Sequence, residues 1–251
     1  VDAGTMCTVD QESAFRFARG EEITTTHGLR AKLGRPLDFL VLTDHAEAMG
    51  VAPMVRESNP VLLSSKRGRE VWEAFNAGGE QAMKAFGGLL ADVSAGVNPF
   101  ADIDMAGSIW PEFVKLADTY NQPGVFTAMT GFEWTSQPNG NNLHRIVVFA
   151  DGADKTSVVQ PFSMFDSQDP AKLWDYMERY EASTGGRVFA HVHNGNLSNG
   201  IAFTAATFDG TPMDAAYAAR RARWEPIMEI TQVKGDGETH PYLSPDDEFA
   251  D

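Results

Sequence analysis

Five short apolar segments, separated by amphipathic stretches, constrain the fold of this chain more than any other feature. Each segment is rich in Val, Ile, Leu or Phe, and turn residues such as Asn139-Gly140 and Gly185-Gly186 flank these segments. Short apolar runs bounded by turn residues are typical of strands, and their alternation with helical patterns indicates an α/β domain. We therefore expect a mainly parallel sheet, either open or closed into a barrel. The predicted strands are Pro36–Thr43, Val125–Thr135, Leu143–Ala150, Arg187–His193 and Ile227–Val233.

Helix start and stop signals separate these strands. Thr8 with Gln11 three residues later predicts a capping box, and Gly20 predicts the end of that first helix. Asp169 before Pro170 predicts an N-cap and first helical position, with Gly185 as the stop. Further helices are predicted at Lys66–Ala77 and Ser108–Asn121, together with a weaker one at Glu80–Val93 that Gly87-Gly88 interrupts.

Composition excludes several classes of protein. A hydrophobic content of 43% favours a folded chain, and the net charge of −15 disfavours a nucleic-acid scaffold, because such a surface repels phosphate backbones. The single Cys7 excludes an internal disulfide framework and a Cys-rich zinc module. No apolar run is long enough for a membrane span, and no targeting segment is visible, so the compartment stays open between cytoplasm and periplasm. The acidic segment 235–251 is predicted to be a solvated loop or tail.

Ionisable residues lie at or near the ends of all five predicted strands. Because the carboxyl ends of parallel strands meet at one edge of a sheet, these side chains are expected to converge there. Imidazole and carboxylate groups together are ligands of Zn²⁺, Mn²⁺ or Fe²⁺, which favours a metal site over hydrogen-bonded strand ends. The residues are Asp44, His45, Glu133, His191, His193 and Glu229 near the carboxyl ends, and His144 at the start of its strand.

Several motifs agree in order and spacing with one family of proteins. Residues 35–47, 131–145, 193–200 and 221–238 resemble a large bacterial family of unknown function that has a PHP-like core, PHP denoting the polymerase and histidinol phosphatase superfamily. The resemblance covers residues 1–251 and implies a single domain, a distorted (β/α)7 barrel with two or three divalent metal ions at its carboxyl mouth. Members of the superfamily also carry a His-x-His strand before these motifs and an Asp-x-His strand after them. Neither strand occurs in this sequence, so the resemblance implies a fragment that is incomplete at both ends.

The resemblance also implies roles for individual residues. His45, His144 and His193 correspond to imidazole ligands, Asp44 to a ligand or its orienting partner, and Glu133 to a carboxylate that bridges two metals. Glu133 and Asp44 are therefore the expected catalytic residues. His191 is interpreted as either a ligand or a packed strand histidine, and Glu229 as a residue that orients a ligand or water. Further donors that could face a substrate are Arg145, Asn194, Asn196 and Lys234.

These roles predict a metal-dependent hydrolase that uses a water acidified by the metals, most simply a phosphoesterase acting on a small anionic substrate. Two alternatives stay open: an amide or carbonyl hydrolase with the same machinery, and a non-catalytic ligand-binding domain. No nucleophile elbow, P-loop or dinucleotide fingerprint is present, which argues against serine hydrolases, NTPases and dinucleotide enzymes. An exposed sheet edge left by two absent end strands would favour a homodimer.

Overall fold

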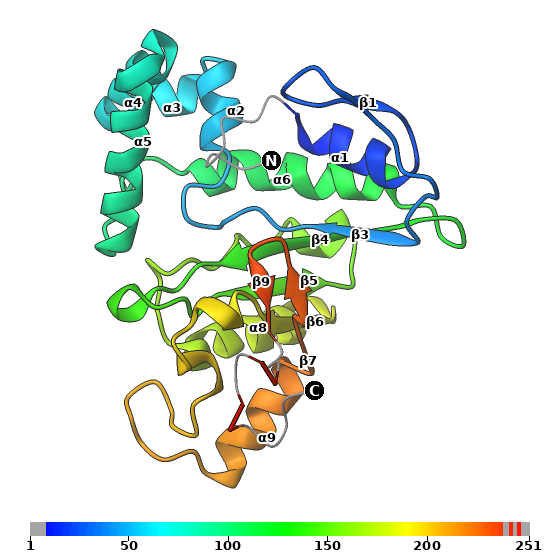
Figure 1. Cartoon of the computed structure of the whole chain (residues 1–251), viewed down its shortest axis with the longest axis vertical. Helices are drawn as coiled ribbons and strands as arrows, with labels where there is room; N and C mark the ends of the chain where they lie inside the picture. The colour runs from blue at the N-terminus through cyan, green and yellow to red at the C-terminus, as the bar shows by residue number, and fades with distance from the viewer. Residues whose placement is uncertain (1–8, 238–240, 243–244, 247–251) are drawn as a thin grey trace.

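A curled five-stranded sheet that forms half of a barrel lies at the centre of the molecule (Figure 1). The computed structural model describes residues 9–237, 241–242 and 245–246. The strands follow the order β3-β4-β5-β6-β7 across the sheet, and each of the five predicted strands contributes one of them. A complete seven-stranded barrel stays a prediction. The strands are β3 Phe39–Leu42, β4 Thr127–Trp134, β5 Arg145–Phe149, β6 Val188–Val192 and β7 Ile227–Met228.

The sheet is mixed, and the expectation of a mainly parallel sheet needs correction at β5. β3 pairs with β4 and β6 with β7 in parallel, whereas β5 is antiparallel to both of its neighbours. The reason is the connection after β4, which holds only a short 3-10 turn at Pro138–Gly140. A parallel return would need a longer crossover, usually with a helix. Because β5 runs in reverse, the beginning of this strand meets the carboxyl ends of β3, β4 and β6.

A glycine in β4 lets the sheet curl tightly. A Cβ at Gly131 would lie 2.6 Å from the carbonyl oxygen of Val147 on β5 and 2.9 Å from Cγ1 of Val41 on β3. Neither contact is compatible with a side chain, because real Cβ atoms essentially never approach other atoms so closely. Glycine at this position therefore allows both neighbouring strands to bend around β4, as glycines commonly do at tight bends of barrel-like sheets.

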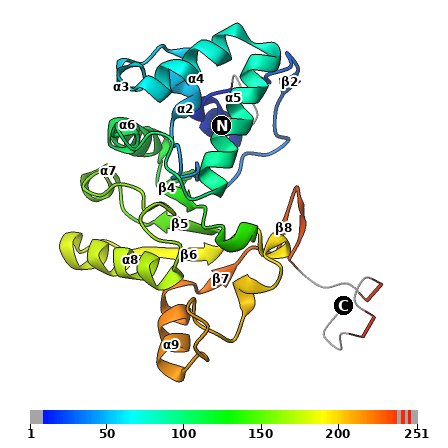
Figure 2. The same cartoon turned by 90° about the vertical axis from the view of Figure 1, so that its left-hand side faces the viewer.

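Helices on one side of the sheet bury its apolar face (Figure 2). Phe132 and Trp134 of β4 are fully buried there among side chains of α6 and α8, whereas Glu133 between them has the opposite orientation. The indole nitrogen of Trp110 donates to the carbonyl oxygen of Thr156, which ties α6 to α7. The helices are α6 Met105–Tyr120, α7 Ala153–Thr156 and α8 Pro170–Thr184. The N-cap predicted at Asp169 is present, with its carboxylate accepting from the amide of Ala171.

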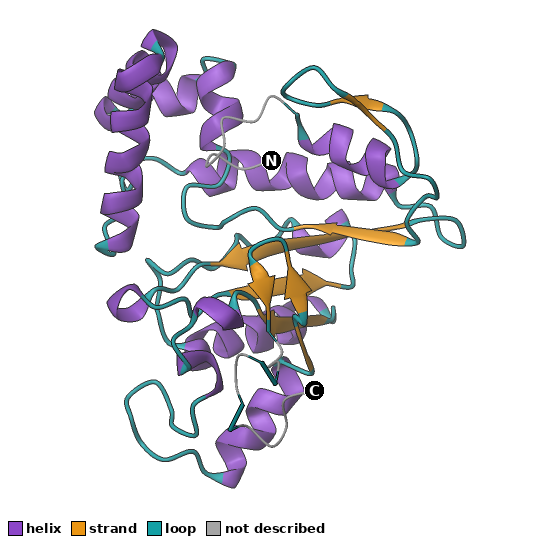
Figure 3. Ribbon diagram, in the orientation of Figure 1, coloured by secondary structure: helices purple, strands orange, loops and turns teal. Residues whose placement is uncertain are grey.

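The helices that follow β3 and precede α6 in the sequence form a separate layer with a core of its own (Figure 3). Two of its helices correspond to the predictions at Lys66–Ala77 and Glu80–Val93, whereas the two shorter ones, α2 and α3, were not predicted. The prediction that Gly87-Gly88 interrupts a helix was wrong: α5 continues through both glycines, and Leu89 beside them is buried. Apolar packing of this face outweighs the low helix propensity of glycine. The helices are α2 Val51–Arg56, α3 Pro60–Ser64, α4 Lys66–Ala77 and α5 Gly79–Ser94.

The ends of the described chain add small elements. The first helix, α1 Gln11–Ala18, is capped by Asp10, whose carboxylate accepts from the amide of Ser13. The predicted cap Thr8 lies outside the described residues. The predicted strand Ile227–Val233 is split, because the chain leaves β7 and turns into the β8–β9 hairpin, and β9 takes the first two residues of the predicted acidic loop. The remaining elements are β1 Ile23–Thr24, β2 Arg30–Ala31, α9 Ala215–Trp224, β8 Thr231–Gln232, β9 Gly235–Asp236 and 3-10 turns at Gly195–Leu197 and Ile201–Phe203.

Candidate metal centre

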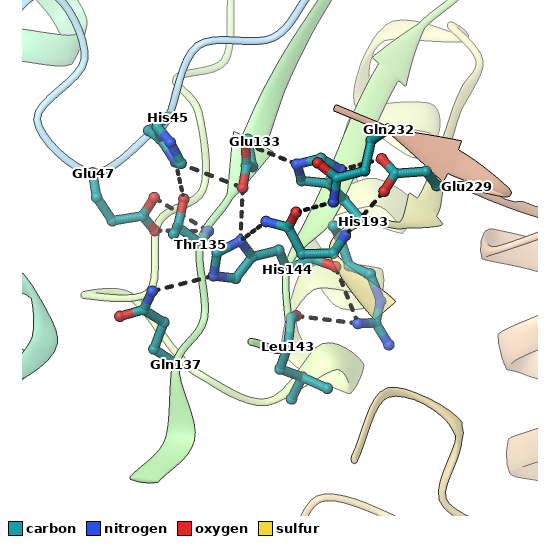
Figure 4. A network of polar contacts seen from close by, with 12 residues as sticks. His45, Glu47, Glu133, Thr135, Gln137, Leu143, His144, His193, Glu229 and Gln232 are labelled. Carbon is teal, nitrogen blue, oxygen red and sulfur yellow. Dashed lines mark hydrogen bonds and ion pairs between the residues drawn. The ribbon is translucent and has the colours of Figure 1, made fainter. Parts of the chain in front are cut away.

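Three histidines surround one carboxylate where β3, β4 and β6 end and β5 begins (Figure 4). Oε1 of Glu133 lies 2.8 Å from Nδ1 of His144 and 3.6 Å from Nδ1 of His45. Oε2 of the same carboxylate lies 3.7 Å from Nε2 of His193. The two oxygens of Glu133 therefore face different imidazoles. Residues that are up to 148 positions apart in the sequence form one cluster, which we call the His–Glu cluster.

Backbone hydrogen bonds fix the relative positions of these side chains. The amide of Glu133 donates to the carbonyl oxygen of Asp44, and the amide of Ala46 donates to that of Glu133, both at 2.9 Å. On the other side, the amide of His193 donates to the carbonyl oxygen of His144 at 3.1 Å. The cluster is thus attached to the ends of paired strands, which hold side chains more precisely than loops do.

Burial and positive neighbours act on Glu133 in opposite directions. The side chain is 8% exposed, and loss of water raises the pKa of its carboxyl. The 2.8 Å contact with His144 and electrostatic attraction to the three imidazoles outweigh burial, so the pKa of Glu133 is lowered overall. For His144 the balance is reversed: burial lowers its pKa more than Glu133 raises it. The cluster therefore favours an ionised carboxylate beside a neutral imidazole.

One atom of this cluster cannot satisfy both of its neighbours. Nδ1 of His144 lies 3.0 Å from the amide nitrogen of Asn194, which needs an acceptor, and 2.8 Å from Oε1 of Glu133, which needs a donor. In this arrangement the amide nitrogen of Gln232 donates to Oδ1 of Asn194 at 2.5 Å, and the amide nitrogen of Asn194 is directed towards His144. Within the described residues, the buried Oε1 has no hydrogen bond of acceptable geometry. A buried carboxylate oxygen that lacks a hydrogen bond is energetically costly, and a cation bound beside it would compensate this cost.

Neighbouring residues orient two of the imidazoles. Glu229 makes a very short contact with Nδ1 of His193, which leaves Nε2 facing Glu133. Nδ1 of His45 lies 2.6 Å from the hydroxyl oxygen of Thr135. A carboxylate on the far nitrogen of a histidine is the usual support of a metal-ligating imidazole. Glu229 lies between β7 and β8 rather than within a strand.

Two further carboxylates lie in the segment after β3. Oδ2 of Asp44 accepts from the side-chain amide nitrogen of Gln11 on α1 at 2.6 Å. Glu47 was not predicted. Its buried carboxylate accepts from the backbone amides of Thr135 at 3.2 Å and Met164 at 2.5 Å, and burial raises its pKa despite these bonds. The only sequence feature that could have indicated a role for Glu47 was its position two residues after His45.

The other predicted residues are placed differently from one another. Nδ1 of His191 faces the carbonyl oxygen of Val192 at 3.1 Å, and burial lowers the pKa of this imidazole. The guanidinium of Arg145 is buried in an ion pair with Glu225, and it donates to the carbonyl oxygen of His144 at 3.3 Å. Arg145 therefore supports the backbone of the cluster. Asn196 and Lys234 are exposed, at a 3-10 turn and at the β8–β9 hairpin.

The donor set fits divalent cations, although it does not form a closed coordination sphere. No group of three or more His, Cys, Asp or Glu side chains within the described part of the chain is arranged to hold one metal ion. Ligands bound to one tetrahedral Zn²⁺ lie about 3.3 Å apart, as follows from bond lengths of about 2.0–2.1 Å. The N–O separations of 2.8, 3.6 and 3.7 Å around Glu133 are close to that value.

Comparison with known proteins identifies the family. A family model described as "Protein of unknown function (DUF3604)" matches residues 1–251, so the chain belongs to this family. A search of curated proteins and a search of solved structures found no match. Within the described residues, no helix combines the length and apolar character that a membrane span needs.

Proposed function

We propose that this member of the DUF3604 family is a metal-dependent hydrolase of the phosphoesterase type, built on a PHP-like barrel. The observation that carries the proposal is the division of the two Glu133 oxygens between separate imidazoles, with Oε1 buried and lacking a hydrogen bond among the described residues. A carboxylate with this environment suits a bridge between two cations. Its negative charge offsets part of theirs, while neutral imidazoles complete the ligand set.

Each side chain of the cluster has a definite task in this proposal. Glu133 would hold two divalent cations, for which Zn²⁺, Mn²⁺ and Fe²⁺ are the candidates, and His45, His144 and His193 would supply the imidazole ligands. Glu229 holds His193 in the orientation that directs Nε2 towards Glu133. When bound, the cations supply an acidified water as nucleophile and stabilise the charge that develops on the substrate.

Charge around the cluster favours metals as the anion-binding groups. The nearest predicted cation, Arg145, is neutralised by Glu225 at 2.9 Å, and no Lys or Arg is among the described partners of the His–Glu cluster. A phosphoester would therefore be held through the cations and not through a guanidinium fork. The same groups would also polarise a carbonyl, so a carboxylic ester or amide belongs in the substrate panel as the competing reaction.

The proposal is tested by metal content and turnover measured together. We expect the natural protein to bind divalent metal and to hydrolyse phosphomonoesters or phosphodiesters. Glu133→Gln preserves the size of the side chain but removes its charge, so it should lower both metal stoichiometry and turnover. Glu229→Gln should cost only about 10–100-fold in metal affinity or rate, because it changes the support of one ligand.

Asp175→Asn is the matched control, since it removes an ion-paired carboxylate on α8 that makes no contact with the cluster. It should retain wild-type metal content and rate. Wild-type metal content and rate in Glu133→Gln would refute the bridging role. Metal binding without turnover on phosphorus or carbonyl substrates would favour the non-catalytic binding domain instead.

A further inference from the structure

A cavity of about 290 Å³ adjoins the His–Glu cluster on the side of α5. His45, Thr135, Gln137 and His144 line its polar end, and these residues are labelled in Figure 4. The opposite wall is formed by apolar side chains of α5 and of the segment around α2. The apolar lining residues are Ala48, Met49, Val51, Phe86, Leu89, Leu90 and Val93.

The α5 wall follows from helix periodicity. Phe86, Leu89, Leu90 and Val93 recur at positions i, i+3, i+4 and i+7, so they lie on one face of the helix. Leu89 is also part of the core beneath α5, which fixes the helix against α2 and α4. Leu90 is about half exposed although it lines the cavity. The wall is therefore anchored by packing, while its apolar surface stays accessible.

The chemistry of the cavity changes from one end to the other. Two imidazoles of the proposed metal centre lie at the polar end, whereas no Lys or Arg is among the lining residues. The one lining carboxylate, Glu47, is occupied by backbone amides. The negative charge of a bound anionic group would therefore be balanced only at the His–Glu cluster. The rest of the cavity is suited to an uncharged hydrocarbon group.

We propose that this cavity binds the apolar group of the substrate, so that the substrate is an alkyl or aryl ester with a single anionic head. The inference rests on the proposed function, since it assumes that the anionic head lies at the His–Glu cluster. A cavity of about 150 Å³ lined by Leu, Ile and Phe accommodates benzene, so 290 Å³ suffices for an aromatic ring or a short alkyl chain. Sugar phosphates and polyphosphates would bury polar groups against α5 without partners.

Binding of n-alkylphosphonates tests the proposal, because their carbon–phosphorus bond resists hydrolysis. Dissociation constants are measured by calorimetry for the ethyl to hexyl members, with the natural protein in the presence and absence of Zn²⁺. We expect affinity to rise about fourfold for each added methylene until the cavity is full. Leu90→Asp should abolish most of this dependence on chain length, because it places a carboxylate against the apolar chain.

Met83→Asp is the matched control. Met83 lies two helical turns before Leu90 on α5, is 64% exposed and does not line the cavity, so the same added charge should leave the dependence intact. The inference would be overturned by equal affinities across the series or by absence of binding at every chain length. It would also be overturned if both variants lost the dependence on chain length to the same extent. If chain-length dependence holds while no ester is hydrolysed, the proposed hydrolase activity is wrong and the binding pocket stands.

Discussion

The buried ion pair between Arg145 and Glu225 should stabilise the whole sheet. Both side chains are only 2% exposed, and Oε1 of Glu225 accepts from Nε of Arg145 at 2.9 Å and from the indole nitrogen of Trp174 at 3.0 Å. Nη1 of Arg145 also donates to the carbonyl oxygens of Leu143 and His144. Removal of either partner leaves a charge in a site that water does not reach, which costs about 3–5 kcal/mol.

The two single variants should differ because the partners are not equivalent. After Arg145→Met, Glu225 still has Arg221, whose Nε lies 3.3 Å from Oε2, so the loss should be near the lower limit of about 3 kcal/mol. After Glu225→Leu, Arg145 has only carbonyl oxygens as described partners, and the loss should approach the upper limit of about 5 kcal/mol. At about 2–4 °C per kcal/mol for a chain of this size, the melting temperature should fall by about 6–20 °C.

A double-mutant cycle in urea measures this coupling. The double variant Arg145→Met/Glu225→Leu should recover much of the lost free energy of unfolding, because no uncompensated charge is then buried. The control is Arg223→Met, which breaks a more exposed ion pair with Glu181 and should cost no more than about 1 kcal/mol. The reasoning would be refuted if both single variants lost less than about 1 kcal/mol of unfolding free energy. It would also be refuted if the loss in the double variant equalled the sum of the two single losses.

Two further predictions concern the sheet and its acid stability. Gly131→Ala should lower the free energy of unfolding in urea by about 1–3 kcal/mol, because the added Cβ would meet the backbone of β5. The control Gly87→Ala should be neutral or stabilising, because no atom lies within 4 Å of its added Cβ. Equal effects of the two substitutions would contradict the role given to Gly131. Burial raises the pKa of Asp151, but hydrogen bonds from the Arg187 amide, Lys155 and Tyr180 outweigh it and lower the pKa below 3.8. Asp151 should therefore stabilise the fold above about pH 3.8 and lose this contribution as the pH falls through the lowered value, so that Asp151→Asn converges with the wild type in acid unfolding; a constant difference down to pH 2 would exclude this.

The positions of the strands and of four cluster residues could be predicted from the sequence. β3 to β6 lie within four of the predicted apolar runs, and β7 lies at the beginning of the fifth. These runs could be recognised because a buried strand needs apolar residues within its own short segment, whichever strands it later pairs with. His45, Glu133, His144 and His193 stood at strand ends, and the ends of paired strands necessarily meet at the edges of a sheet.

Pairing and packing decided what the sequence left open. The direction of β5 and the continuity of α5 through two glycines depend on which surfaces lie against each segment. The neutralisation of Arg145 by Glu225, 80 residues away, and the burial of Glu47 beneath Thr135 likewise need the assembled chain. A local pattern specifies whether a segment can form a strand or helix, because dihedral preference and periodicity are local. The partner of a charge is set by distances between remote segments, and only the tertiary structure brings those segments together.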